Sequence, residues 1–418
     1  MPASDEVDVA VIGAGAAGLS AGRRLMAEPG LRVLVLEAGD RVGGRAHTAF
    51  MPAIDAPLDR GCGWLHGAER NPWTRIAEGS GLTVDRTPAP WGEQYRDLGF
   101  TPMEQEAASL SYAAYHARAE AAAGAAADVP LSACLDPDDP WNGRLDAIST
   151  YVSGAELAQV SAHDAGAYRV AGPDWRVREG FGHAIARHGA GVPVALGTPV
   201  RGIDHSASAW VVVETGRGAV RARAAIITLP TDLLAAGVVR FTPALPEKIE
   251  AAAGLPLGLA DKVFLQVDPA ADLPADGHLV GDPRAARTGA YHLRPFGRPV
   301  IESYYGGPLA RDLEGAGEAA AFAFAADELA ALLGAGIRRS LRPLTATAWG
   351  RDPLARGSYA YARPGRAGAR AVLAAPVADR LFFAGEATSP HAFTTAQGAH
   401  ETGVAAAEAA LRALRPPR

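Results

Sequence analysis

The sequence of 418 residues predicts an α/β fold, and three features support this class. Residues 7–12 form a β-branched run that leads through a glycine-rich turn into a small-residue helix at 19–27. A second apolar run at 31–36 follows, so the first forty residues complete a βαβ unit. The chain closes with a strand at 380–384 and a helix at 396–414. Two parallel strands joined by a helix define the α/β class.

The turn after the first strand carries a Gly-x-Gly-x-x-Gly motif. Its first glycine allows a tight turn, the second lets backbone N–H groups approach a pyrophosphate, and the third allows the helix to pack closely. Glu37 ends the second strand about 20 residues later, where an acid binds the hydroxyls of an adenosine ribose. The sequence therefore predicts a Rossmann-like dinucleotide site that contains Gly13, Ala14, Gly15, Ala16, Ala17, Gly18 and Glu37.

Strand-like segments further along the chain fall into two groups. Those at 192–200, 210–214 and 224–229 are predicted to return to the first sheet, and those at 262–267 and 299–305 to form another sheet. We therefore expect a Rossmann-like nucleotide-binding domain interleaved with an α+β domain that combines a mixed sheet with helices. The first comprises residues 1–75, 190–250 and 366–418, and the second residues 76–189 and 251–365.

Composition narrows the range of partners and compartments. The chain has 40 Lys and Arg against 46 Asp and Glu, a formal net charge of −6, and no basic run, which disfavours nucleic acid as a partner. Its two cysteines, Cys62 and Cys134, cannot build a disulfide framework, and the first residues lack the pattern of a signal peptide. The most apolar stretch, 319–337, includes two acids, so no membrane span is expected. These features predict a cytoplasmic protein.

The residues after Glu37 make a family resemblance specific. Ala38 is followed by Gly43 and Gly44, which permit close backbone approach, and by Arg45, whose guanidinium can bind phosphate oxygens. Together with the first strand, turn and helix, this stretch resembles the N-terminal signature of the FAD-dependent amine oxidase superfamily. That superfamily includes monoamine oxidases, polyamine oxidases and flavin histone demethylases. The resemblance implies FAD as the cofactor and covers most of the chain except residues 85–165.

A segment that ends in Trp-Leu-His-Gly is similar to the part of the family that passes the flavin ring and the substrate. The resemblance implies cofactor contacts for Gly61, Cys62, Gly63 and Trp64, and a substrate-facing role for His66. The alternative for the histidine is a structural role in a turn. L-amino-acid oxidases have an arginine that binds the substrate carboxylate at about the position of Trp64. Because this chain has tryptophan there, the resemblance favours an amine without a carboxylate as the substrate.

Lys262 lies in an otherwise apolar strand, where a charge is costly unless it has partners. It resembles the family's lysine that holds a water molecule against N5 of the flavin. The alternative is an edge-strand lysine whose side chain reaches solvent.

A stretch from Trp349 to Tyr359 resembles the family's Trp…Asp-Pro…Gly-Ser-Tyr segment, most closely in polyamine oxidases and histone demethylases. In monoamine oxidases a cysteine at the position of Ser358 carries the flavin covalently, and serine cannot form that thioether. We therefore expect non-covalent FAD. Tyr359 matches one of two aromatic residues that flank the substrate amine, and Thr395 stands in place of the second. Packing within a strand is the alternative for the tyrosine.

The C-terminal segment resembles the family's second FAD fingerprint. The resemblance implies that Gly385 and Glu386 meet the ribityl-phosphate region. It also directs the N-terminus of the helix that begins with Thr395 and Ala396 at O2 of the flavin, where its partial positive charge favours the reduced cofactor. Val200 is similar to the residue whose backbone meets the adenine.

These features predict an FAD-dependent oxidase of a primary or secondary amine, with polyamine-like substrates favoured, that reduces O2 to hydrogen peroxide. The expected catalytic residues are Lys262, Tyr359, His66 and Thr395. Histidine and acid spacings support no metal site, and a homodimer is compatible with the sequence. Glu93, Glu156 and Glu302 are each candidates to meet a distal ammonium. Two alternatives stay open: an FAD-dependent desaturase or dehydrogenase on the same scaffold, and a non-catalytic FAD-binding protein.

Overall fold

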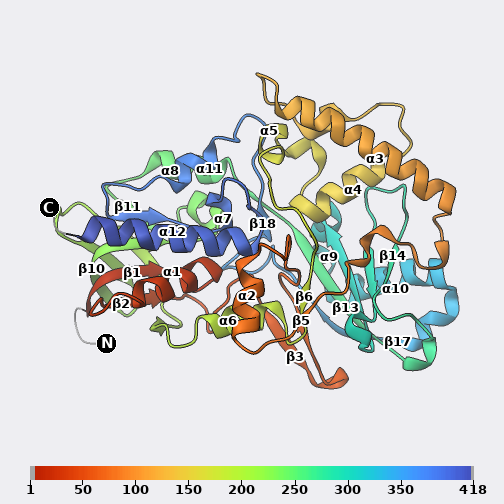
Figure 1. Ribbon diagram of the computed structural model, residues 1–418, viewed down its shortest axis with the longest axis horizontal. Coiled ribbons are helices and arrows are strands. Elements are labelled where there is room, and N and C mark those ends of the chain that lie inside the picture. The colour runs from red at the N-terminus through yellow and green to blue at the C-terminus, as the bar shows by residue number, and fades with distance from the viewer. Residues whose placement is uncertain (1–4, 416–418) are drawn as a thin grey trace.

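Two separate β-sheets organise the chain in the computed structural model, which describes residues 5–415. Figure 1 shows the first sheet and its helices at one end of the long axis, close to both termini, and the second sheet at the other end. The α/β class predicted from the sequence is confirmed.

The first sheet has eight strands in the order β11-β8-β9-β10-β1-β2-β7, with β19 paired to β10. Strands β2, β1, β10 and β19 run parallel to one another, whereas β9 is antiparallel to both β8 and β10. The carboxyl ends of the parallel strands therefore meet at one edge. The strands are β1 (Asp5–Ile12), β2 (Val33–Leu36), β7 (Val194–Ala195), β8 (Val200–Asp204), β9 (Val211–Thr215), β10 (Gly218–Ile227), β11 (Arg240–Thr242) and β19 (Leu381–Phe383).

The predicted single strand at 192–200 is wrong. The structure has two strands there, β7 at one edge of the sheet and β8 close to the other. Gly197, with φ 58°, turns the chain between them. The backbone N–H groups of Gly197 and Thr198 donate to the carbonyl oxygens of Gly39 and Glu37, at 2.8 and 2.7 Å. These bonds to the segment after β2 stabilise the turn.

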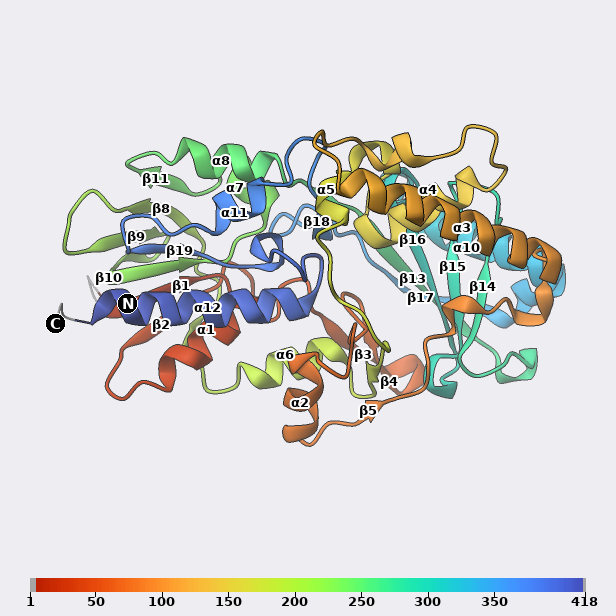
Figure 2. The same ribbon diagram turned by 45° about the horizontal axis from the view of Figure 1, so that its top comes forward.

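Helices cover both faces of the first sheet. Helices α1 (Ala16–Met26) and α12 (Ala396–Leu414) pack together on one face, and α7 (Thr231–Ala235), α8 (Pro246–Ala253) and α11 (Ala369–Ala374) lie on the other, as Figure 2 shows. A Cβ at Gly403 of α12 would lie 2.2 Å from the carbonyl oxygen of Ala17, so this close helix pair requires glycine. The helix predicted at 19–27 begins three residues earlier, because Gly15 is its N-cap.

The second sheet has five antiparallel strands in the order β14-β15-β16-β13-β17. Its strands are β13 (Ala260–Val267), β14 (Gly277–Val280), β15 (Ala290–Leu293), β16 (Val300–Gly306) and β17 (Leu341–Ala346). Helices α9 (Gly307–Ala316) and α10 (Glu318–Leu333) pack on it, and α4 (Asn142–Ser153) contacts β16. Helix α3 (Pro102–Ala123) starts at a capping box formed by Thr101 and Glu104.

Short elements join the two sheets. Strand β12 (Leu257–Gly258) pairs with β18 (Tyr359–Ala360) where the chain passes between them. The others are β3 (Thr48–Met51), β4 (Ala56–Asp59), β5 (Val84–Asp85), β6 (Arg176–Val177), α2 (Pro72–Gly79), α5 (Ala162–Ala165) and α6 (Phe181–His188). The domain boundaries given above stay a prediction. Within residues 5–415, no helix has both the length and the apolar character needed to cross a membrane.

Candidate functional site

The predicted dinucleotide motif lies at the carboxyl edge of the parallel strands. Gly15 caps α1, and no side chain among residues 5–415 caps that helix with a hydrogen bond. A Cβ at Gly15 would meet no atom within 4 Å, so the space in front of the helix N-terminus is open. Gly13 has φ 102°, and a Cβ at Gly18 would lie 1.8 Å from its carbonyl oxygen, so the turn tolerates only glycine. An open helix N-terminus behind a glycine turn fits a pyrophosphate.

Glu37 lies against the same turn. Its Oε2 accepts a hydrogen bond from the Ala14 amide and its Oε1 one from the Gly39 amide, both at 2.7 Å. The Gly43 amide donates to the Ala14 carbonyl at 2.8 Å, and a Cβ at Gly44 would lie 3.3 Å from Cα of Gly15. Ala16 and Ala17 form the first turn of α1, and Ala38 follows Glu37. The structure therefore brings the predicted ribose acid and both predicted phosphate loops together.

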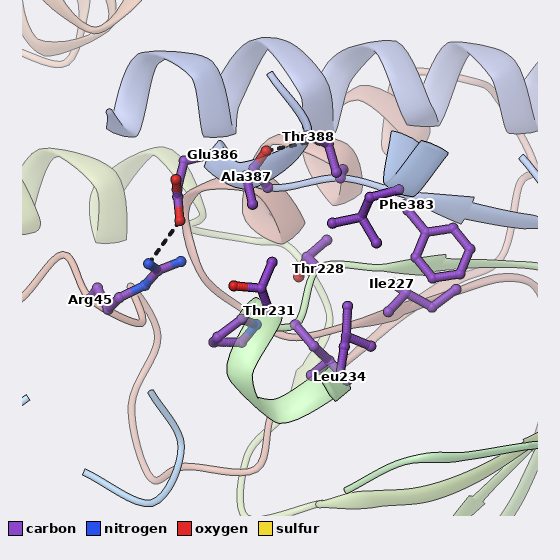
Figure 3. A pocket seen from close by; sticks show the side chains of 14 residues that line it. Arg45, Ile227, Thr228, Thr231, Leu234, Phe383, Glu386, Ala387 and Thr388 are labelled. Carbon is purple, nitrogen blue, oxygen red and sulfur yellow. Dashed lines mark hydrogen bonds and ion pairs between the residues drawn. The ribbon is translucent and has the colours of Figure 1, made fainter. Parts of the chain in front are cut away.

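Arg45 and Glu386 form an ion pair between segments 341 positions apart, with Nη1 and Oε1 separated by 3.0 Å. The guanidinium also donates to the carbonyl oxygen of Ser358 at 2.7 Å. The Glu386 carboxylate is buried and accepts hydrogen bonds from the amides of Ala360 and Thr394. Figure 3 shows Arg45 and Glu386 facing each other at one side of a pocket, which strands β10 and β19 help to line at their carboxyl ends.

The segment from Gly385 to α12 contributes an open turn and a helix cap. Gly385 has φ 137°, and a Cβ there would meet no atom within 4 Å. The Thr395 hydroxyl accepts from the Gly398 amide at 3.0 Å and donates to the Ala392 carbonyl at 2.7 Å. This cap occupies the hydroxyl, so a role for Thr395 beside the substrate stays a prediction. The Ala396 carbonyl accepts the indole N–H of Trp73 at 2.8 Å, which anchors the start of the helix.

Lys262 is buried on β13, a strand with neighbours on both sides, so the edge-strand alternative is wrong. Its Nζ lies 2.8 Å from Oε1 of Glu302 and donates to the carbonyl oxygen of Asp59 at 2.9 Å. Burial acts to lower the pKa of Lys262, but the charge and hydrogen bond of Glu302, together with Asp59 and Tyr304, raise it further, and the net pKa lies above the ordinary value. The lysine is therefore a buried, permanently charged ammonium. Glu302 serves as its partner and is not free for a distal ammonium.

Two tyrosines lie beside this lysine. Tyr304 pairs with Lys262 across the β13–β16 ladder, so the two side chains share a face of the sheet. The Tyr304 and Tyr359 hydroxyls are 2.8 Å apart, and Tyr359 also donates to the carbonyl oxygen of Tyr151. Burial raises the pKa of both phenols, so they stay neutral. The Ser358 hydroxyl bonds the amide and the carbonyl of Ala260, which ties this segment to β13.

Most of the remaining residues predicted to contact the cofactor pack against the segments that carry Arg45 and Lys262. Trp349 is buried and its indole N–H donates to the Arg60 carbonyl at 3.1 Å. A Cβ at Gly61 would lie 1.7 Å from the carbonyl oxygen of Arg45, and one at Gly63 would lie 3.4 Å from Nζ of Lys262. Burial raises the pKa of the Cys62 thiol to about 12, so it stays protonated. Val200, at the start of β8, follows the turn that bonds to Glu37.

His66 and Trp64 occupy a more exposed cluster. The His66 ring bonds Asp174 at 3.0 Å and its side chain is 42% exposed. The Trp64 ring lies 4.7 Å from Trp91 and 5.0 Å from the guanidinium of Arg176. Between residues 5 and 415, no hydrogen bond joins His66 to Lys262 or Tyr359.

Sequence reasoning missed Arg176. The side chain is buried and pairs with Asp276 at 2.7 Å, while its Nε and Nη2 have no partner among the described residues. Its two-residue strand β6 carries no motif, so no local signal could have indicated it.

Comparison with known proteins agrees with this arrangement. The model of the family described as flavin-containing amine oxidoreductase matches residues 16–130 and 138–411. Polyamine oxidase 2 of Arabidopsis thaliana is 30% identical, over 96% of this chain and 87% of that protein. A lysine-specific histone demethylase 1 homolog 2 of Oryza sativa subsp. japonica is 28% identical, over 97% of this chain and 57% of that longer protein.

Solved structures have the same fold. A putrescine oxidase bound to putrescine aligns with a TM-score of 0.80 at 20% identity, over 98% of this chain and all of that chain. Cyclohexylamine oxidase from Brevibacterium oxydans aligns with a TM-score of 0.80 at 22% identity, covering 97% and 99% of the two chains. The family resemblance inferred from the sequence is confirmed. The chain belongs to the flavin-containing amine oxidoreductases, and it is a flavin-dependent oxidoreductase that acts on CH–NH or CH–NH2 groups.

Proposed function

We propose that this protein oxidises a small primary or secondary amine to an imine, with O2 as the electron acceptor and hydrogen peroxide as the second product. The amine loses two hydrogens from its C–N unit and O2 gains them, so atoms and electrons balance. Water then hydrolyses the imine to an aldehyde or ketone, with release of ammonia from a primary amine or of the smaller amine from a secondary one. Relatives named polyamine oxidase and a fold neighbour bound to putrescine favour a polyamine-like substrate.

The observation that carries this proposal is the buried ammonium of Lys262. It lies between the Glu302 carboxylate and the Asp59 carbonyl, on the same sheet face as Tyr304. A fixed positive charge in a poorly solvated site stabilises the negative charge that develops when O2 is reduced. The ammonium can also donate a hydrogen bond to a water molecule.

The residues around the glycine turn fit FAD, and we propose that they hold it without a covalent bond. The open N-terminus of α1 would meet the pyrophosphate, Glu37 the ribose, and Arg45 with Glu386 the ribityl-phosphate region. When bound, the flavin accepts a hydride equivalent from the α-carbon of the substrate. Ser358 carries a hydroxyl where a thioether would need a thiol.

The chain's own contribution is position and proton control. Tyr359 is fixed by two hydrogen bonds, so its ring presents a rigid wall to a substrate amine. An amine arrives as a cation, attracted by the acidic protein, and only its neutral form has the lone pair that oxidation requires. Burial beside Lys262 disfavours a second positive charge, so the site selects the neutral amine.

An anaerobic titration of the purified holoenzyme with a panel of amines, amino acids and alkenes tests the proposal. We expect a diamine or polyamine to bleach the visible flavin absorbance, and air to restore it with release of peroxide. Bleaching by an alkene but by no amine would favour the desaturase alternative. Bleaching by an amino acid alone would refute the plain-amine assignment and would point to the buried guanidinium of Arg176.

A further inference from the structure

A second cavity, of about 330 Å³, lies between the five-stranded sheet and helices α9 and α10. Side chains alternate along a strand, so Asp261 and Val263 face this cavity while Lys262 faces away from it. Tyr305 lines it from the neighbouring strand β16. The cavity is therefore separated from the candidate catalytic face by the thickness of the sheet. It is far larger than the ~10–15 Å³ that one water molecule needs.

Asp261 brings an unsatisfied charge to this cavity. Its side chain is 5% exposed. Oδ1 accepts hydrogen bonds from the Thr347 hydroxyl at 2.6 Å and the Trp349 amide at 3.1 Å. Oδ2 is buried and has no hydrogen-bond partner within the part of the chain that the structure describes. A carboxylate oxygen that has left water needs a donor, and two can serve here: the proton of the neighbouring Glu314 carboxyl, or a cation that takes the place of that proton.

Glu314 of α9 lies next to Asp261 in the lining of the cavity. Its Oε1 accepts from the Gly350 amide at 2.8 Å. Burial raises the pKa of Glu314 to about 7, together with a hydrogen bond that the protonated carboxyl makes to Asp261 and the charge of Asp261, whereas the Gly350 amide and Arg351 act to lower it. Two carboxyls that oppose each other in this way retain a strong affinity for a positive charge.

The other groups that face the pair come from every element around the cavity. They are Glu318 of α10, Arg60 after β4, Arg351 and the Tyr305 phenol. Arg60 donates from Nη2 to the Ala346 carbonyl at 2.8 Å, whereas its buried Nε has no partner among the described residues. Two arginines balance two of the three carboxylates, so one negative charge is uncompensated when all three are ionised. The cavity as a whole therefore favours a cation once Glu314 is ionised, above about pH 7.

The walls decide which kind of cation fits. Val263, Ala310, Leu313 and Ala321 give the cavity apolar sides next to the acidic pair. An apolar wall beside two carboxylates suits an ion with a charged head and an alkyl body. No group of three or more metal-ligating side chains occurs among residues 5–415, which disfavours a divalent metal.

We propose that this cavity binds an alkylammonium ion, whose N–H groups donate to Oδ2 of Asp261 and to the carboxylate of Glu314. The site is distinct from the one that holds Lys262. It does not depend on the amine being oxidised. Because the ion replaces the proton of Glu314, binding strengthens as pH rises through about 7.

Calorimetry of the holoenzyme with tert-butylammonium chloride tests this site. This amine has no hydrogen on its α-carbon, so it cannot be dehydrogenated. We expect binding at pH 8.5 that weakens about tenfold at pH 6, as the ionised fraction of Glu314 falls. tert-Butanol, which has the same shape without the charge, should not bind.

Three variants separate this site from other amine sites. Glu314→Gln keeps an oxygen for the Gly350 amide but should abolish the binding. Ala321→Leu narrows the cavity without touching a carboxylate and should do the same. Asp312→Asn, on the same helix but exposed outside the cavity, should bind as the wild type does. Equal affinity in all variants, no heat at millimolar amine, or a flavin absorbance change that accompanies all binding would overturn the proposal.

Discussion

The ion pair of Lys262 and Glu302 can be tested by removing each partner. Lys262→Met keeps the length of the side chain and removes its charge, which leaves the Glu302 carboxylate, 20% exposed, without its cation. At a separation of 2.8 Å, the gross attraction is about 6 kcal/mol for an effective dielectric constant of about 20. Burial offsets much of this, so we expect the substitution to cost about 3 kcal/mol of unfolding free energy.

The matched variants are Glu302→Gln and the double substitution, measured by urea unfolding. Glu302→Gln leaves the buried lysine without its carboxylate partner and should also destabilise the protein. The double variant leaves no unpaired charge, so its cost should be about 2 kcal/mol smaller than the sum of the two single costs. Additive costs would refute the inference that the two groups act as a buried pair.

The same Lys262→Met variant separates the two halves of the reaction. Because the ammonium acts on O2 in the proposed mechanism, anaerobic bleaching by an amine should persist. Recovery of the absorbance in air should slow about 100-fold, which corresponds to about 2.7 kcal/mol of lost charge stabilisation. Stopped-flow absorbance measures both steps. Recovery at the wild-type rate would show that Lys262 does not assist oxygen.

Three further predictions follow. Gly15→Ala adds a methyl group that meets no protein atom, so folding should be unaffected while flavin binding weakens at least about tenfold. The flavin-to-protein absorbance ratio of the purified variant measures this loss. Gly79→Ala, whose added methyl group also meets no atom, is the control. The kcat/KM for an amine should rise with pH as the substrate loses its proton, and a profile flat from acid to alkaline pH would contradict selection of the neutral amine. Burial lowers the pKa of His188 and His400 to about 4, so the unfolded state binds more protons between pH 4 and 6.5 and the free energy of unfolding should fall as pH drops through that window. In urea titrations, a double variant with His188→Gln and His400→Gln should lose about 2 kcal/mol of this pH dependence. An unchanged pH dependence in the variant would contradict the prediction.

The local sequence pattern was sufficient to predict most of the strands and helices. The strands near the N-terminus and the closing helix were predicted within a few residues, because apolar periodicity and the glycine turn are properties of adjacent residues. The segment at 192–200 failed because its turn is stabilised by the carbonyl oxygens of Glu37 and Gly39, far away in the sequence. Nothing within the segment itself shows that these acceptors exist.

In the candidate site, too, some residues could be predicted from the local sequence and others could not. Lys262 was found because a charge in an apolar strand is unusual, but its partner depends on how β13 and β16 align. Glu302 reaches Lys262 diagonally across that ladder, two positions from the directly opposite Tyr304. A shift of one residue would turn Glu302 to the other face. Only the register can distinguish it from Glu93 and Glu156.

The strand that carries Lys262 also explains why a second polar site exists. Asp261 and Lys262 are adjacent, so in a strand they must face opposite sides of the sheet. Both are buried here, and each therefore needs its own partners. Thr347 bonds to both neighbours, since it accepts from the Lys262 amide at 2.8 Å and donates to Asp261 at 2.6 Å. The strand is covered on both faces, so Asp261 and Lys262 each require polar neighbours on their own face of the sheet. For Asp261, these neighbours lie in the cavity beside Glu314.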